Sequence, residues 1–225
     1  MGFVITIDGP AASGKSSVSR GLAKLMSIPW VSTGAFYRAL AYAALHNKVP
    51  LDSAEALTEL AMGNDWKVVM TPEKTQIWYK GNDVTDAAAQ EDVGNVASKI
   101  SHYPEVRSSL LDHQRQCALN SNGLIAEGRD CGTVVFSQAE VKIYLTANSK
   151  HRAHRRAMEL GLDHSEMVAQ QKVRDEQDSS RKVAPLQIPK DALVIDATLM
   201  SIEQVVQQIY DHSLINNTVR GALNL

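Results

Sequence analysis

The sequence predicts an α/β fold in which helices flank a central parallel sheet. Two features support this prediction. Short apolar segments with strand character alternate with helical segments along the chain, and strands separated by helices favour a parallel sheet with right-handed crossovers. The first strand is also followed by a glycine-rich turn and then by a helix, which is the local order of a phosphate-binding loop.

The elements of the main sheet are short and mostly apolar. Strands are expected at residues 3–7, 30–32, 123–127, 141–145 and 193–196. The apolar spacing within 16–26 predicts a helix with one buried face. Two further helices are expected, one through Phe36, Leu40 and Leu45 and one over 105–119, where Pro104 suits a first turn. The polar residues after Asp211 are expected to fray.

One stretch of the chain breaks this alternation. Residues 66–70 and 76–79 have strand character, a turn-rich segment separates them, and 80–83 has the composition of a further turn. They predict a small antiparallel sheet in an insertion of about 64–86. Its aromatic side chains are interpreted as hydrophobic cover for that sheet rather than as a base-stacking platform: Trp66, Trp78 and Tyr79.

The composition excludes several classes of protein. A length of 225 residues, 44% of them hydrophobic, suits one compact domain with insertions. The net charge of −2 does not favour a nucleic-acid partner, and no apolar window approaches the roughly 20 residues of a membrane span. We expect a soluble, cytoplasmic protein. Its two cysteines form no CxxC pair, which argues against a disulfide framework or a thiolate metal site: Cys117 and Cys131.

The glycine-rich turn matches the pattern G-x-x-x-x-G-K-[ST], with a strand before it and a helix after it. The glycines let the backbone aim its amides at a phosphate chain, and the helix start adds partial positive charge. Lys15 would reach the β- and γ-phosphates, and the Ser16 hydroxyl would ligate Mg²⁺. The sequence thus predicts a P-loop NTPase fold that binds ATP and Mg²⁺ through Gly9, Pro10, Ala11, Ala12, Ser13, Gly14, Lys15, Ser16 and Ser17.

The sequence disfavours a GTPase, because two motifs typical of GTPases are missing. The nearest approach to a guanine-specific NKxD motif is residues 47–50, which lack the carboxylate. None of the 13 glycines has an aspartate three residues before it, so a DxxG motif is missing as well. The residues by themselves indicate a P-loop phosphotransferase with an anionic acceptor, because a P-loop alone does not identify the reaction.

Several segments resemble the bacterial cytidylate kinase family, whose members are nucleoside monophosphate kinases. The resemblance covers about 4–208, with agreeing order and spacing. It implies ATP-dependent phosphorylation of CMP, and of dCMP too, by a monomer with an NMP-binding insertion and a mobile lid. The segments that carry it are 7–10 (IDGP), 33–38 (TGAFYR), 127–136 (EGRDCGTVVF), 152–156 (RAHRR) and 181–186 (RKVAPL).

The resemblance also implies how the chain is divided. Residues 1–225 would form a single kinase domain. Its core would comprise 1–32, 120–148 and 184–211, and its NMP-binding region would be 33–119. The lid would span about 149–165 and be followed by a helix over 166–182.

The acceptor site implied by the family is rich in arginine. Transfer between two polyanions requires positive groups around the reacting oxygens, and the arginine fork matches phosphate. The residues implied for the acceptor phosphate are Arg38, Arg129 and Arg181, with Thr33 and Tyr37 nearby. Those implied for the ribose are Arg174 and Asp178, and those for the cytosine edge are Ser98, Arg107 and Asp130.

The cytosine assignment also has a chemical basis. A carboxylate such as that of Asp130 accepts a hydrogen bond from the cytosine N4 amino group and would repel O4 of uracil. Arg107 could donate to the O2 and N3 acceptors. No general base is required, because the acceptor phosphate is already an anionic nucleophile and in-line positioning with charge neutralisation supplies most of the rate.

Residues 150–156 are strongly basic. Alone, such a run is a solvated helix face, but beside a P-loop it resembles the kinase lid, whose arginines fold over the phosphates and exclude water. Arg152 and Arg155 are predicted to bind ATP. The predicted catalytic set is Lys15, Arg129, Arg155 and Arg181. Three histidines in or near the lid are interpreted as surface residues rather than a metal site: His151, His154 and His164.

Some assignments stay open at this point. Glu127 stands where the family often has aspartate, so its water-mediated contact to Mg²⁺ is a hypothesis. A kinase of another small anionic acceptor, such as another nucleotide, shikimate or gluconate, is the nearest alternative, and a non-catalytic nucleotide sensor is the more distant one. The segment 127–136 favours the nucleotide acceptor, and the number of arginines argues against the sensor.

Overall fold

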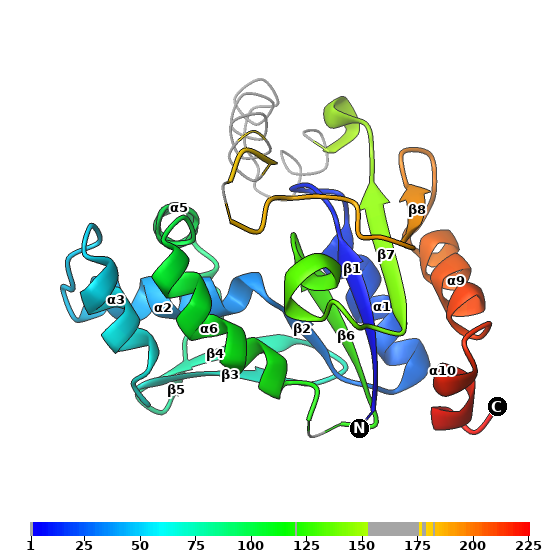
Figure 1. Cartoon of the computed structure of the whole chain (residues 1–225), viewed down its shortest axis with the longest axis horizontal. Helices are drawn as coiled ribbons and strands as arrows, with labels where there is room; N and C mark the ends of the chain where they lie inside the picture. The colour runs from blue at the N-terminus through cyan, green and yellow to red at the C-terminus, as the bar shows by residue number, and fades with distance from the viewer. Residues whose placement is uncertain (1, 120, 153–175, 177–178, 182) are drawn as a thin grey trace.

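The computed structural model describes residues 2–119, 121–152, 176, 179–181 and 183–225; Figure 1 shows the remainder as a thin grey trace. Its main sheet has five parallel strands in the order β2-β6-β1-β7-β8. The predicted parallel sheet is therefore confirmed, and the predicted strand ends differ from the observed ones by at most one residue. The strands are β1 (Phe3–Asp8), β2 (Trp30–Ser32), β6 (Gly123–Gly128), β7 (Val141–Thr146) and β8 (Leu193–Asp196).

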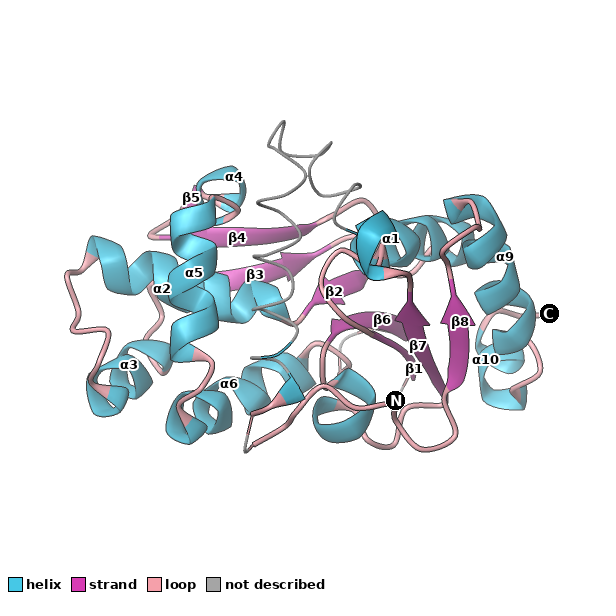
Figure 2. Cartoon of the chain, turned by 90° about the horizontal axis from the view of Figure 1, so that it is seen from above, coloured by secondary structure: helices cyan, strands magenta, loops and turns pink. Residues whose placement is uncertain are grey.

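The central strand β1 is buried on both faces. Phe3, Ile5 and Ile7 lie in one hydrophobic cluster with side chains of α1 (Lys15–Met26) and α9 (Ile202–Ser213). Val4 lies in a second cluster, with residues of the helices that cover the other face. Figure 2 shows the sheet between α1 on one side and α6 on the other. Burial on both faces explains why apolar residues occupy consecutive positions in β1, and the two polar side chains of the strand, Thr6 and Asp8, are buried as well.

The elements between β2 and β6 lie mainly to the left of the main sheet in Figure 1. It contains a three-stranded antiparallel sheet in the order β3-β4-β5, as predicted, although 82–83 is a short strand rather than part of a turn. Its strands are β3 (Trp66–Met70), β4 (Thr75–Tyr79) and β5 (Asn82–Asp83). Its helices are α2 (Gly34–His46), α3 (Ala54–Ala61), α4 (Thr85–Ala88), α5 (Glu91–Ile100) and α6 (Pro104–Gln116).

The aromatic residues of the small sheet pack as the sequence predicts. Trp66 and Tyr79 are buried, and the Trp66 ring meets Phe36 of α2 edge-on, with the ring centroids 6.3 Å apart. Trp78 is half-buried, and the Lys67 ammonium lies 5.6 Å from its ring centroid. These contacts support the interpretation as hydrophobic cover. Within the part of the chain that the structure describes, no helix is long and apolar enough to cross a membrane.

The expectation that the chain frays after Asp211 is wrong. Helix α9 continues to Ser213, and a further helix, α10 (Asn217–Ala222), follows it. Asn216 caps α10 by accepting hydrogen bonds from the amides of Thr218 and Val219. Val219 has no exposed surface and belongs to the cluster around β1. One buried apolar side chain and one cap thus order a tail whose composition is polar.

We predict that this packing contributes measurably to stability. Val219→Ala should lower the free energy of unfolding by about 2 kcal/mol, because it removes buried methyl groups and leaves a cavity. The matched control is Ile215→Ala, since Ile215 is 75% exposed and surface truncations usually change stability by less than about 0.5 kcal/mol. Urea denaturation measures both, and equal losses would contradict the assignment of Val219 to the core.

Candidate active site

The P-loop leaves the sheet where the sequence predicts, between the end of β1 and the start of α1. Gly14, the N-cap of α1, has φ 96°, a conformation that side chains rarely adopt. At Gly9, an added Cβ would lie 2.0 Å from the carbonyl oxygen of Leu145 on β7. No side chain caps the start of α1, so its first amides are oriented for an anion.

Lys15 folds back over this loop. Its Nζ donates to the carbonyl oxygen of Pro10 at 2.7 Å and lies 3.4 Å from Ser13 Oγ. The side chain is buried although it is charged. A buried ammonium held against a phosphate-binding turn is suited to stabilise negative charge.

The next residue contacts the neighbouring strand. Ser16 Oγ donates a hydrogen bond of 2.9 Å to Glu127 Oε1, on β6. Glu127 is buried and lies close to the carboxyl end of its strand. A hydroxyl and a carboxylate side by side form an oxygen donor pair of the kind that Mg²⁺ prefers, and Mg²⁺ needs few protein ligands because it keeps several waters. The pair therefore fits the metal site that the sequence predicts.

A cavity of about 590 Å³ opens beside this pair. Every residue predicted for the acceptor that the structure describes lines it: Thr33, Tyr37, Arg38, Ser98, Arg107, Arg129, Asp130 and Arg181. The same cavity is lined by Glu127 and by part of the predicted ATP set: Ala11, Ala12, Gly14, Lys15, Ser16 and Ser17. The fold thus brings both predicted groups to one space.

Among the described residues, four that are predicted for ATP do not line this cavity: Gly9, Pro10, Ser13 and Arg152. The Arg152 side chain is buried, its Nε donates to the carbonyl of Ala147, and its Nη1 donates to the carbonyl of Ala11 at 2.8 Å. Arg152 therefore braces the P-loop backbone in this structure, and its contact with phosphate stays a prediction. Arg155, Arg174 and Asp178 lie outside the described residues, as do His154, His164 and most of the predicted lid.

Arg107 and Asp130 form an ion pair on one wall of the cavity. Both side chains are buried, and Arg107 Nη2 donates to Asp130 Oδ2. The guanidinium also lies 5.6 Å from the ring centroid of Tyr37. Burial raises the pKa of Asp130, an effect that the guanidinium groups of Arg107 and Arg181 oppose. Burial likewise raises the pKa of Tyr37 to about 12, so its hydroxyl stays a donor.

Two backbone carbonyls hold the Arg38 guanidinium. Its Nη1 donates to the carbonyl of Ala88 at 2.7 Å and to that of Gln90 at 3.2 Å. It also lies close to α5, where a Cβ added to Gly94 would lie 2.8 Å from Nη2. Gly94 therefore gives the guanidinium room to lie along that helix and face the cavity.

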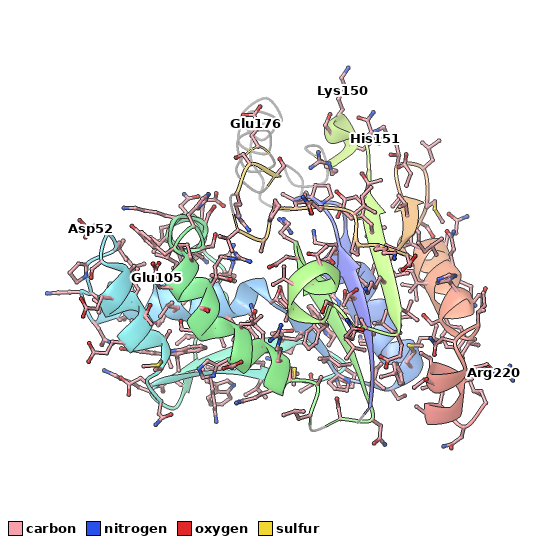
Figure 3. All side chains as sticks on the ribbon, viewed as in Figure 1. Asp52, Glu105, Lys150, His151, Glu176 and Arg220 are labelled. Carbon is pink, nitrogen blue, oxygen red and sulfur yellow. The ribbon has the colours of Figure 1, made fainter. Side chains whose placement is uncertain are left out.

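Thr33 ties β2 to the end of β6. Its hydroxyl donates to the carbonyl of Glu127 at 3.1 Å, and its amide donates to the same oxygen at 2.9 Å. Cys131 Sγ lies 3.5 Å from the same hydroxyl. Cys131 is fully buried, and burial raises the pKa of its thiol well above the ordinary value, so the side chain acts as a packing residue. His151 projects from the surface in Figure 3, as predicted.

Sequence reasoning missed one buried carboxylate beside the P-loop. Asp8 has no exposed surface and accepts hydrogen bonds from the amides of Cys131 and Gly132. Burial is the largest influence on its pKa and raises it to about 6, whereas the two amide bonds lower it. A charged residue at the end of an apolar strand was the available signal. Four further residues that line the cavity were not predicted, and no pattern in the sequence marks them: Thr75, Ile77, Thr85 and Ser101.

Comparisons with known proteins agree with this geometry. The family model described as "Cytidylate kinase" matches residues 5–214. A cytidylate kinase of Bdellovibrio bacteriovorus is 60% identical over 94% of this chain and 98% of its own length. One of Serratia proteamaculans is 42% identical over 94% and 95% of the two chains. Among solved structures, an uncharacterised protein from Eubacterium ventriosum has a TM-score of 0.52 at 13% identity, covers 95% and 98% of the two chains, and supports the fold alone.

The raised pKa of Asp8 predicts a pH dependence of stability. Because the folded state binds this proton more tightly than the unfolded state, the contribution is fully present below pH 3.8 and is lost as the pH rises through about 6. A difference of about two pKa units corresponds to about 3 kcal/mol. Relative to Asp8→Asn, the wild-type free energy of unfolding should therefore fall by up to that amount between pH 4 and pH 7. Urea denaturation across this range measures the difference, and a constant difference would refute the assignment.

Proposed function

The chain belongs to the cytidylate kinase family, and we propose that the cavity described above is where it transfers a phosphoryl group from ATP to CMP. The observation that carries this assignment is that residues of the P-loop and the predicted acceptor residues line one continuous cavity. A kinase needs the donor and acceptor phosphates in line and in contact. The family match does not favour the alternative acceptors or the sensor.

We assign the donor side to the P-loop. Backbone amides at the start of α1 would bind the β- and γ-phosphates of ATP, and Lys15 would move from the Pro10 carbonyl to the phosphate chain. Ser16, and Glu127 through water, would hold Mg²⁺, which when bound neutralises charge on the phosphates. The chain's own contribution is electrostatic and is preorganised by burial of these groups.

The acceptor phosphate is assigned to Arg38, Arg129 and Arg181. Arg38 is already oriented by two carbonyls, so little conformational freedom is lost when it binds an anion. Thr33 and Tyr37 lie beside these arginines as neutral hydroxyl groups. Catalysis would come from neutralising the two approaching phosphates, without a general base.

The cytosine edge is assigned to Asp130 and Arg107, with Ser98 nearby. Their ion pair presents a carboxylate acceptor and a guanidinium donor side by side, which complements the N4 amino group and the O2 and N3 acceptors of cytosine. Uracil would place an oxygen against the carboxylate. Acceptance of dCMP, ribose contacts from Arg174 and Asp178, closure by Arg155, a monomeric state and a cytoplasmic location remain predictions.

A substrate panel tests this function. We expect a coupled ADP-release assay with ATP and Mg²⁺ to show the highest kcat/KM with CMP and dCMP among CMP, dCMP, UMP, AMP and dTMP. Lys15→Ala should abolish turnover with every acceptor, because it removes the ammonium from the P-loop. Preference for an acceptor outside the cytidine pair would refute the substrate assignment, and normal turnover by Lys15→Ala would refute the site.

The base assignment is tested separately. Asp130→Ala should lower kcat/KM for CMP about 10- to 100-fold, the range for a lost hydrogen bond to a charged group, and should change kcat/KM for UMP far less. Ser109→Ala on α6 is the control, because its hydroxyl donates to the carbonyl of Val106 in its own helix and it does not line the cavity. Equal losses of kcat/KM with CMP and UMP in the Asp130 variant would exclude the proposed role.

A further inference from the structure

We propose that Asp8 is a positioning residue. It holds residues 129–132, which we call the acceptor segment because two of them are assigned to binding CMP, against the strand that leads into the P-loop. It acts through backbone amides and touches neither substrate. This inference rests on the proposed function of the cavity, because the segment concerned carries Arg129 and Asp130.

The contacts of Asp8 use both of its carboxylate oxygens. Oδ1 accepts from the amide of Cys131 at 2.8 Å, and Oδ2 accepts from the amide of Gly132 at 2.7 Å. These are the first two residues of a short π-helix, η1 (Cys131–Val135), whose own N-cap, Asp130, makes no side-chain cap bond. The first amides of a helix have no partner within it, so a carboxylate from a different strand satisfies them here.

The two hydrogen bonds to Asp8 attach the acceptor segment to β1 close to the residues proposed to bind CMP. The ladder between β1 and β6 ends where Asp8 is aligned with Gly128, and the backbone beyond Gly128 leaves the sheet. The carboxylate of Asp8 then fixes the same segment again, three residues later. Arg129 and Asp130 lie between these two attachments, and both of them line the cavity.

There is little room for this segment to move toward the sheet. A Cβ added to Gly132 would lie 2.8 Å from Thr6 Oγ1 and 3.2 Å from Asp8 Oδ2. The path of the chain after Asp8 is also fixed, because a Cβ at Gly9 would lie 2.0 Å from the Leu145 carbonyl oxygen. The length of the Asp8 side chain therefore sets the distance between β1 and the acceptor segment.

The charges around Asp8 are arranged consistently with this role. Lys15 on α1 lowers the pKa of Asp8, and Asp130 on the acceptor segment raises it. Above pH 7 the carboxylate is ionised and can accept from both amides. We therefore place the experiment at pH 8, where the proposed link is complete.

The decisive variant is Asp8→Asn, which keeps the shape of the side chain. Its amide oxygen can accept from one backbone N–H, but its NH₂ group faces the other N–H and cannot accept from it. The matched control is Glu140→Gln. Glu140 Oε2 accepts from the amide of Val4 at 2.7 Å, so it makes the same kind of bond near the opposite end of β1.

We expect Asp8→Asn to raise the KM for CMP at least tenfold and to reduce the ratio of kcat/KM for CMP over UMP at least threefold. The Kd of a non-hydrolysable ATP analogue should change less than threefold. Glu140→Gln should change none of these quantities, even if it lowers the thermal unfolding midpoint as much as Asp8→Asn does. A uniform loss of CMP and ATP affinity, or an unchanged CMP to UMP ratio in Asp8→Asn, would overturn the proposal.

Two further measurements keep the proposal testable in other cases. If Asp8→Asn does not fold, Asp8→Glu keeps both acceptors and adds one methylene; it should show the same raised KM for CMP, and wild-type kinetics would overturn the proposal.

If the wild type prefers another acceptor, the proposed function fails instead. Hydrogen exchange at the amides of Cys131 and Gly132 then decides the positioning role: exchange should accelerate at least tenfold in Asp8→Asn, and unchanged exchange would refute it.

Discussion

The parallel pairing of β1 with β6 is the constraint on which the candidate site depends. It aligns Asp8 with Gly128, so the P-loop and the acceptor segment leave the sheet side by side at one edge. Ligands bind at this carboxyl edge in open α/β sheets because the loops there diverge and leave a crevice. Near this edge, Ser16 on α1, the helix that follows the P-loop, donates its hydrogen bond to Glu127 on β6. Without this register, the P-loop residues and the residues proposed for the acceptor would not line one cavity.

The cavity collects positive charge without any strong excess of basic residues in the chain. Hydrogen-bond acceptors orient the guanidinium groups of two arginines on the cavity walls. Carbonyl oxygens of Ala88 and Gln90 hold Arg38, and the carboxylate of Asp130 holds Arg107. Fixing guanidinium groups before the ligands arrive reduces the reorganisation needed to stabilise transferring phosphate. The protein therefore concentrates its arginines by backbone placement, while its net charge stays near zero.

Residues of very different visibility in the sequence contribute to this arrangement. Lys15 and Ser16 belong to a motif whose fixed spacing is enough to identify them. Gly94 belongs to no such pattern, and Asp8 stands in the segment 7–10 that resembles the family without any role being implied for its side chain. Asp8 matters because it accepts hydrogen bonds from two backbone amides, and Gly94 matters because it leaves space for the Arg38 guanidinium. Both are relations between segments that are distant in sequence, and no local pattern encodes such relations.

The strands of the main sheet and the P-loop could be located from the amino-acid sequence, because apolar periodicity and motif spacing are local properties of the chain. The family was indicated by the resemblance of several segments. Three features became visible only in the folded chain: Glu127 contacts Ser16, Arg152 braces the P-loop, and Val219 orders the polar C-terminal tail. The physical reason is the same in each case. A hydrogen bond or a buried methyl group depends on which surfaces meet after the strands have paired, and that is set by the packing of the whole domain.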